Sequence, residues 1–151
     1  MAKGCDIVAI YGDELWLIET KEYDRESMKE TRTKSREPAT IIVRKSFDTL
    51  AGLQVGSRYC SDSEIADKCR RAMNCKKVIV CATIEPSTRI SSNYYDRQFL
   101  NQTREQLKRN TVGLADKVYV TQNRDQQAWK KWSSHKDSST RRCLTAELNR
   151  S

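Results

Sequence analysis

The chain has 151 residues, of which 37% are hydrophobic and 32% are charged, so it is long enough for one domain with a real core. It contains neither an apolar run of eighteen residues nor a signal-peptide pattern, which argues against a membrane protein and predicts a soluble, cytoplasmic one. The net charge of +8 and the pI of about 9.3 favour a polyanionic partner, with nucleic acid as the first candidate.

Two short apolar segments near the N-terminus flank the dipeptide Gly12-Asp13. A Gly-Asp pair between such segments is typical of a two-residue hairpin turn. In that hairpin the numbers of facing residues sum to 25, so Asp6 faces Glu19. Because side chains alternate along a strand, Asp6, Glu19 and Lys21 are expected on the same face.

Two carboxylates that face each other across a hairpin repel, and the arrangement is costly unless something neutralises it. A divalent metal does so, and Mg²⁺ prefers oxygen ligands from one or two carboxylates. The hairpin therefore indicates a metal site at Asp6 and Glu19. The alternative is a surface hairpin whose ends carry ordinary solvated charges.

The spacing between Asp6 and the segment Glu19-Thr20-Lys21 resembles the PD-(D/E)XK nuclease motif, and the flanking apolar residues are similar to that superfamily as well. The resemblance implies a restriction-endonuclease-like fold and an Mg²⁺- or Mn²⁺-dependent nuclease, with DNA favoured over RNA. It implies that Asp6, Glu19 and the Thr20 carbonyl bind the metal. It also implies that Lys21 positions the attacking water, which makes Asp6, Glu19 and Lys21 the catalytic residues.

The chain departs from the motif at two points. Cys5 stands before Asp6, where the superfamily usually has proline. The superfamily also usually has a helix and a strand before the aspartate, whereas five residues precede Asp6 here. Those elements are expected to be missing, or to be supplied by a partner subunit or by another segment, and a homodimer is a further possibility.

Residues 22–37 are dense in charge of both signs and carry no apolar stripe. They follow the Glu-Thr-Lys segment directly, so Arg32, Lys34 and Arg36 are candidates for contacts with phosphates. A solvated connection without such contacts is the alternative.

Hydrophobic periodicity and capping residues predict three helices and two further strands. The helices are expected at residues 39–54, 62–74 and 94–110, and the strands at residues 77–84 and 117–121. With the hairpin, the order is β-β-α-α-β-α-β. This order predicts an α/β fold, a mixed sheet with an N-terminal antiparallel hairpin flanked by helices.

The helical spacing also predicts which residues face the core. In the first helix Val43, Phe47 and Leu50 recur at helical intervals, which leaves Lys45 on another face. In the third helix Phe99 and Leu107 belong to a repeat of four residues.

The six cysteines, at positions 5, 60, 69, 75, 81 and 143, contain no Cys-x-x-Cys pair. Zinc sites and iron–sulfur clusters usually need such pairs, so reduced thiols of an intracellular protein are favoured. A metal or cluster at the evenly spaced Cys69, Cys75 and Cys81 is the alternative.

Composition divides the chain into an α/β core at residues 1–121 and a basic extension at residues 122–151. In the segment Trp129-Lys130-Lys131-Trp132, aromatic and cationic side chains alternate in a way that suits stacking on bases and contact with phosphates, so Lys130 and Lys131 are nucleic-acid candidates. The favoured alternative is a docked helix, with both tryptophans on one face, followed by a flexible tail.

Two classes of function remain open. The first is the metal-dependent nuclease. The second is a non-catalytic nucleic-acid-binding or assembly subunit on the same fold, which a partner chain completes.

Overall fold

The computed structural model describes residues 3–23, 36–86, 93–122, 129–130, 132–136 and 144–148. The chain divides into two compact units, Met1–Thr121 and Gln122–Ser151, and each is described by itself. None of the helices in the described part of the chain combines the length and apolarity needed to cross a bilayer.

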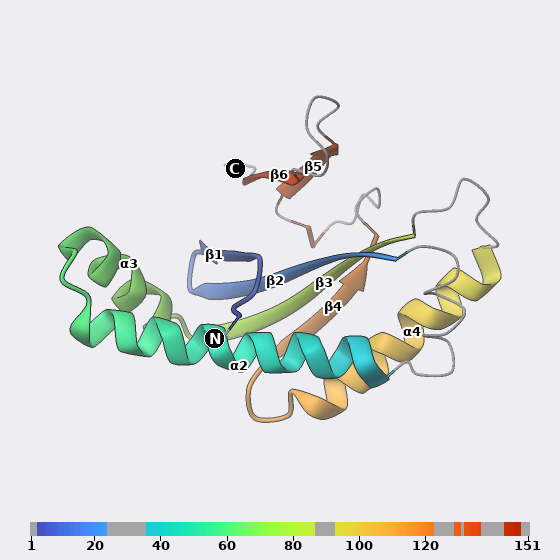
Figure 1. Ribbon diagram of the computed structural model, residues 1–151, viewed down its shortest axis with the longest axis horizontal. Coiled ribbons are helices and arrows are strands. Elements are labelled where there is room, and N and C mark those ends of the chain that lie inside the picture. The colour runs from blue at the N-terminus through green and yellow to red at the C-terminus, as the bar shows by residue number, and fades with distance from the viewer. Residues whose placement is uncertain are drawn as a thin grey trace. The chain divides into compact units, whose positions relative to one another are not determined.

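The first unit is built on one four-stranded mixed sheet (Figure 1). Its strands, in sheet order, are β1 (Ile7–Tyr11), β2 (Glu14–Tyr23), β3 (Lys77–Pro86) and β4 (Lys117–Thr121). The β1–β2 pair is antiparallel, whereas the β2–β3 and β3–β4 pairs are parallel.

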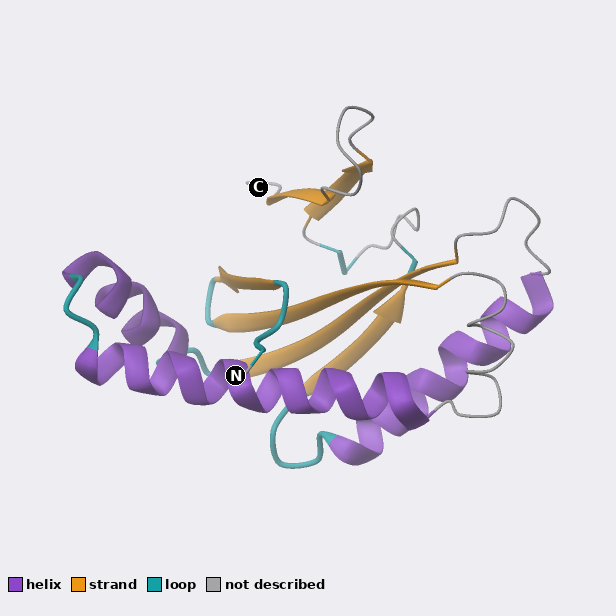
Figure 2. Ribbon diagram, in the orientation of Figure 1, coloured by secondary structure: helices purple, strands orange, loops and turns teal. Residues whose placement is uncertain are grey.

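In the described part of the chain, three helices lie between the parallel strands, so the predicted mixed α/β class is confirmed (Figure 2). They are α2 (Arg36–Tyr59), α3 (Ser63–Met73) and α4 (Asn93–Asn110). Helix α3 lies beside the C-terminal part of α2, and α4 lies beside its N-terminal part (Figure 1).

The hairpin has the predicted register, because Ile10 pairs with Leu15 and Val8 pairs with Leu17. Gly12 begins the two-residue turn at a φ of 60°, in the left-handed region that glycine adopts without a steric penalty. The turn also contacts the start of β3, because the carbonyl of Asp13 accepts hydrogen bonds from the backbone N–H groups of Lys76 and Lys77, at 2.8 and 3.2 Å.

The main core lies between one face of this sheet and the helices. Leu15 and Leu17 of β2 and Val80 of β3 pack there with residues of α2 and α4, among them Ile42 and Phe99. On the opposite face, the rings of Trp16 and Tyr119 stack with their centroids 5.7 Å apart. Since these rings come from β2 and β4, they meet across β3, whose residues Ile79 to Ile84 are all buried. Strand β3 is therefore the central, doubly covered strand.

Helix α2 presents a different face to the core from the one that its large apolar residues predict. Val43 and Leu50 pack against the core as expected, but Phe47 is 56% exposed. The buried line runs instead through Ser46 and Thr49, whose hydroxyl groups donate to backbone carbonyls one turn earlier in the helix. These internal hydrogen bonds allow two small polar residues to be buried at little cost.

The second unit contains β5 (Trp132–Lys136) and β6 (Leu144–Leu148), paired antiparallel. The prediction of a helix carrying Trp129 and Trp132 on one face was wrong, because Trp132 begins a strand. Leu144, Ala146 and Leu148 alternate with polar residues, which is the period of a strand rather than of a helix.

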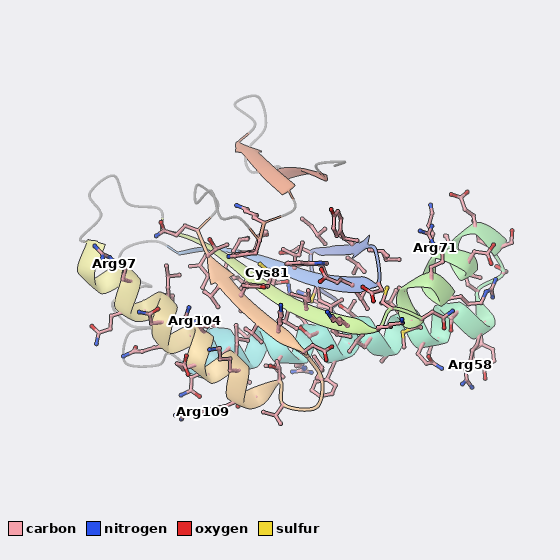
Figure 3. The ribbon with its side chains drawn as sticks, turned by 180° about the vertical axis from the view of Figure 1, so that it is seen from behind. Arg58, Arg71, Cys81, Arg97, Arg104 and Arg109 are labelled. Atoms are coloured by element: carbon pink, nitrogen blue, oxygen red, sulfur yellow. The ribbon has the colours of Figure 1, made fainter. Side chains whose placement is uncertain are left out.

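Exposed arginines are distributed over the outer surfaces of the three helices. Figure 3 shows Arg58, Arg71, Arg97, Arg104 and Arg109 directed away from the sheet, whereas Cys81 lies within it. The five cysteines in the described part of the chain, all except Cys143, are thiols.

Candidate metal and active site

The hairpin brings Asp6 and Glu19 together at the open end of β1. Asp6 directly precedes β1, and the last pair of the register, Ile7 with Ile18, makes Asp6 and Glu19 the next facing positions. The Oδ2 atom of Asp6 accepts hydrogen bonds from the backbone N–H of Thr20 at 2.9 Å and from its hydroxyl at 2.8 Å. At this position the side chain of Asp6, rather than its backbone, forms the hydrogen bonds to β2.

Helix α2 fixes the segment that carries Asp6. The backbone N–H of Cys5 donates to Thr49 Oγ1 at 2.7 Å, and a Cβ atom added to Gly4 would come within 3.0 Å of the same oxygen. Burial raises the pKa of the Cys5 thiol. This effect outweighs the hydrogen bonds with the Thr49 and Ser46 hydroxyls, which lower the pKa. The segment therefore lies against α2 in one register, with a neutral thiol beside the carboxylates.

Glu19 is the most buried charged group described in the structure, with 1% of the residue exposed. Its Oε1 atom lies 2.5 Å from Lys45 Nζ and 3.1 Å from Lys21 Nζ. Its Oε2 atom is buried and has no hydrogen-bond partner within the described part of the chain. A buried carboxylate oxygen without a donor is costly, and such an atom calls for a ligand.

Lys45 joins the two carboxylates, since its Nζ also lies 3.7 Å from Asp6 Oδ1. We call Asp6, Glu19, Lys21 and Lys45 the carboxylate–lysine cluster. The helical pattern placed Lys45 away from the core side, and that prediction was wrong: its side chain is 16% exposed and reaches the sheet. A sequence signal for this direction exists. Lys45 comes three residues after Ile42 and lies on the same helical face as Ser46 and Thr49, which are small enough to face the sheet.

The charges of the cluster stabilise one another. Burial raises the pKa of Asp6, but the hydrogen bonds from Thr20 and the charges of Lys45 and Lys21 outweigh it, so the pKa lies below its ordinary value. Burial lowers the pKa of Lys45, but the hydrogen bond and charge of Glu19 and the charge of Asp6 outweigh it, so the pKa lies above its ordinary value. At neutral pH, Asp6 is therefore a carboxylate and Lys45 an ammonium ion.

Nothing in the described structure tests the proposed nucleic-acid contacts. Arg32, Lys34 and Lys131 lie outside the described residues. Arg36 is the first residue of α2, and Lys130 is half-buried in the second unit. Their roles stay predictions.

The cluster offers few ligands to a metal, and all of them are oxygen atoms. Within the described residues, no group of three or more His, Cys, Asp and Glu side chains is placed to hold an ion. Mg²⁺, however, is commonly bound by one or two carboxylates with water filling the other positions. Asp6 and Glu19 supply such a pair, and Glu19 Oε2 is an oxygen without a donor. The Thr20 carbonyl points to the same side as the Thr20 N–H, which is the side of Asp6. The residues present therefore fit a Mg²⁺ or Mn²⁺ ion.

Comparison with known proteins gives a partial similarity to one curated protein. A stretch of the chain is 33% identical over 93 residues to a cysteine–tRNA ligase of Neisseria meningitidis serogroup A, covering 58% of this chain and 13% of the ligase. The chain thus spans about an eighth of the length of the ligase that it matches. No family model matches the chain, and no solved structure matches it.

Proposed function

We propose that the chain is a metal-dependent nuclease that hydrolyses phosphodiester bonds of nucleic acid. The observation that carries the proposal is the pair of facing carboxylates at the end of the hairpin, one of which is buried with an oxygen that has no donor. A buried carboxylate oxygen without a donor is a cost to folding, even where the other oxygen is paired, and functional sites are where proteins retain costly groups. Lys21 lies beside this pair, as the resemblance to PD-(D/E)XK nucleases implies.

Each residue of the motif has a distinct task in this proposal. Asp6, Glu19 and the Thr20 carbonyl would hold Mg²⁺, which when bound would supply Lewis-acid polarisation of the scissile phosphate. Lys21, whose ammonium lies 3.1 Å from Glu19, donates a hydrogen bond that orients the attacking water. The water oxygen forms a bond to phosphorus as the bond from phosphorus to the leaving oxygen breaks, and a proton passes to the leaving group.

The fold and the overall charge are compatible with this proposal. An antiparallel hairpin at the edge of a mixed sheet, followed by two parallel crossovers, supports a restriction-endonuclease-like core. The net charge of +8 supports a polyanionic substrate. We favour DNA, and since the partially similar protein is named a tRNA ligase, RNA belongs among the substrates to be tested.

Incubation of the wild type and of Glu19→Ala with DNA and RNA, in Mg²⁺, in Mn²⁺ and in chelator, tests the proposal. We expect cleavage by the wild type in metal, with a loss of at least about a hundredfold in Glu19→Ala and in chelator. Glu64→Ala is the matched control, because Glu64 also pairs with a lysine but lies exposed on α3. Undiminished cleavage by Glu19→Ala would contradict the proposal.

The second candidate is a nucleic-acid-binding module without catalysis. The observation that favours it is the carboxylate–lysine cluster itself, in which two ammonium groups balance two carboxylates without a metal. This candidate predicts binding to nucleic acid that weakens steeply with salt, unchanged by chelator, and no cleavage in either metal.

A further inference from the structure

Lys45 differs from Lys21 in what its side chain contacts. Within the described part of the chain, Lys21 pairs with Glu19, whereas the Nζ atom of Lys45 lies 2.5 Å from Glu19 Oε1 and 3.7 Å from Asp6 Oδ1. Lys45 also comes from α2 rather than from the hairpin, and 16% of its side chain is exposed, against 30% for Lys21. Lys45 is therefore the cation that bridges the two carboxylates.

That position is the one that a metal ligated by both carboxylates needs. Mg²⁺ lies about 2.0–2.1 Å from its oxygen ligands. An ammonium nitrogen at 2.5 Å from Glu19 Oε1 already occupies the space beside this oxygen. Two cations a few ångströms apart in a partly buried site also repel strongly. The bridge from Lys45 and a metal bound to Glu19 Oε1 and Asp6 Oδ1 are thus mutually exclusive.

We propose that Lys45 is a placeholder for the metal, which neutralises Asp6 and Glu19 in the metal-free protein and leaves the space between them when the ion binds. The inference rests on the proposed function, since it takes the same two carboxylates as the ligands of the ion. It adds a regulatory property to that function. Lys45 competes with the metal and so raises the concentration of ion at which the site fills.

Lys45 also offsets the repulsion between the two carboxylates that the hairpin brings together. The tight turn at Gly12 forces Asp6 and Glu19 to face each other, and facing carboxylates destabilise a strand pair. Lys45, which comes from α2, removes the repulsion before any ion is present. The long, flexible stem of a lysine then allows the ammonium to move while α2 stays in place.

Mn²⁺ binding to purified full-length protein, measured by titration calorimetry or electron paramagnetic resonance, tests the inference. We expect Lys45→Met to bind Mn²⁺ roughly tenfold more tightly than the wild type, a typical coupling between two mutually exclusive occupants. Lys68→Met removes the same charge from an exposed ion pair on α3 and should bind as the wild type does.

Lys21→Met separates displacement from the general effect of a nearby charge. Lys21 is also close to Glu19 but does not bridge to Asp6, so its removal should raise the affinity for Mn²⁺ by much less than the removal of Lys45. Equal gains for the two variants would show a general charge effect and would overturn the inference, as would an unchanged or weaker affinity of Lys45→Met.

Thermal unfolding supplies a second measurement that does not depend on turnover. In chelator, Lys45→Met should melt below the wild type, because its carboxylates face each other without a cation. Saturating Mn²⁺ should abolish or reverse that difference, since the ion replaces the ammonium. If Lys45→Met does not fold in chelator, Lys45→Gln is measured in its place, with the same expected order. A deficit that persists in Mn²⁺ would count against the placeholder.

The failures of the two proposals differ in their outcomes. A wild type that binds Mn²⁺ and cleaves nucleic acid, with no gain in affinity for Lys45→Met, removes the placeholder and leaves the nuclease. A wild type that neither binds Mn²⁺ nor cleaves removes both.

Discussion

Replacement of Glu19 by Gln tests whether the cluster stabilises the fold in the absence of metal. The change keeps the shape of the side chain but removes the charge that pairs with Lys45 at 2.5 Å and with Lys21 at 3.1 Å. Removing one partner of a fully buried ion pair costs about 3–5 kcal/mol, and an exposed pair contributes about 0–1 kcal/mol. The two lysine side chains are 16% and 30% exposed, and Lys45 keeps its ion pair with Asp6 in the variant. We therefore expect the free energy of unfolding to fall by about 2 kcal/mol.

Equilibrium urea unfolding in chelator measures this loss. With a slope of about 2 kcal/mol per molar for a protein of this size, the midpoint should fall by about 1 M urea. Glu64→Gln, which affects only an exposed pair with Lys68, should leave the midpoint unchanged. An unchanged or higher midpoint for Glu19→Gln would refute the reasoning, because it would mean that the buried carboxylate costs the metal-free fold as much as its ion pairs contribute.

Substitutions at three further positions test the charge of Asp6, the hairpin turn and the cap of α3. The pKa of Asp6 is lowered in the folded protein, so the ionised carboxylate stabilises the fold above the ordinary pKa of 3.8. That stabilisation is lost as the pH falls through the lowered pKa. Asp6→Asn should therefore flatten the dependence of the melting temperature on pH below about pH 4. Gly12→Ala places a Cβ at a φ of 60° and should cost about 1 kcal/mol, or a drop of about 3 °C in the melting temperature, whereas Gly12→Asn should cost less. Asp62 caps α3 by accepting from the backbone N–H groups of Glu64 and Ile65, so Asp62→Ala should lower the stability to urea by about 1 kcal/mol and Asp62→Asn should restore it.

The elements that local patterns define could be predicted from the sequence. The register of the hairpin follows from Gly12-Asp13, because a two-residue turn leaves one way to pair the flanking residues. The strand β4 has the predicted bounds, and Phe99 and Leu107 of α4 are buried as predicted. In each of these cases neighbours in sequence decide the outcome.

Lys45 and the second unit show what local patterns miss. The inward direction of Lys45 depends on Glu19 and Asp6, which lie on other elements and offer charge at close range. Phe47 was expected inside because it is large and apolar, yet the sheet side of α2 needs residues small enough for Gly4 and Cys5 to approach. In the second unit, the spacing of the tryptophans fitted a helix, but the alternation in β6 and its pairing with β5 favour strands. Tertiary contacts decided all three.

The turn at Gly12 and Asp13 imposes a rule of parity on the separation between the two carboxylates. As long as the turn keeps two residues, moving the glutamate by one position along β2 would send its side chain to the opposite face from Asp6. Moving it by two positions would restore a common face. With a two-residue turn the two acids must therefore be an odd number of positions apart, as they are here at 6 and 19. Glu19 lies seven positions after Gly12, roughly 23 Å of extended backbone, so a site that is far from the turn still depends on the length of the turn. A search for other chains with this hairpin can use the odd separation as a filter before any side chain is compared.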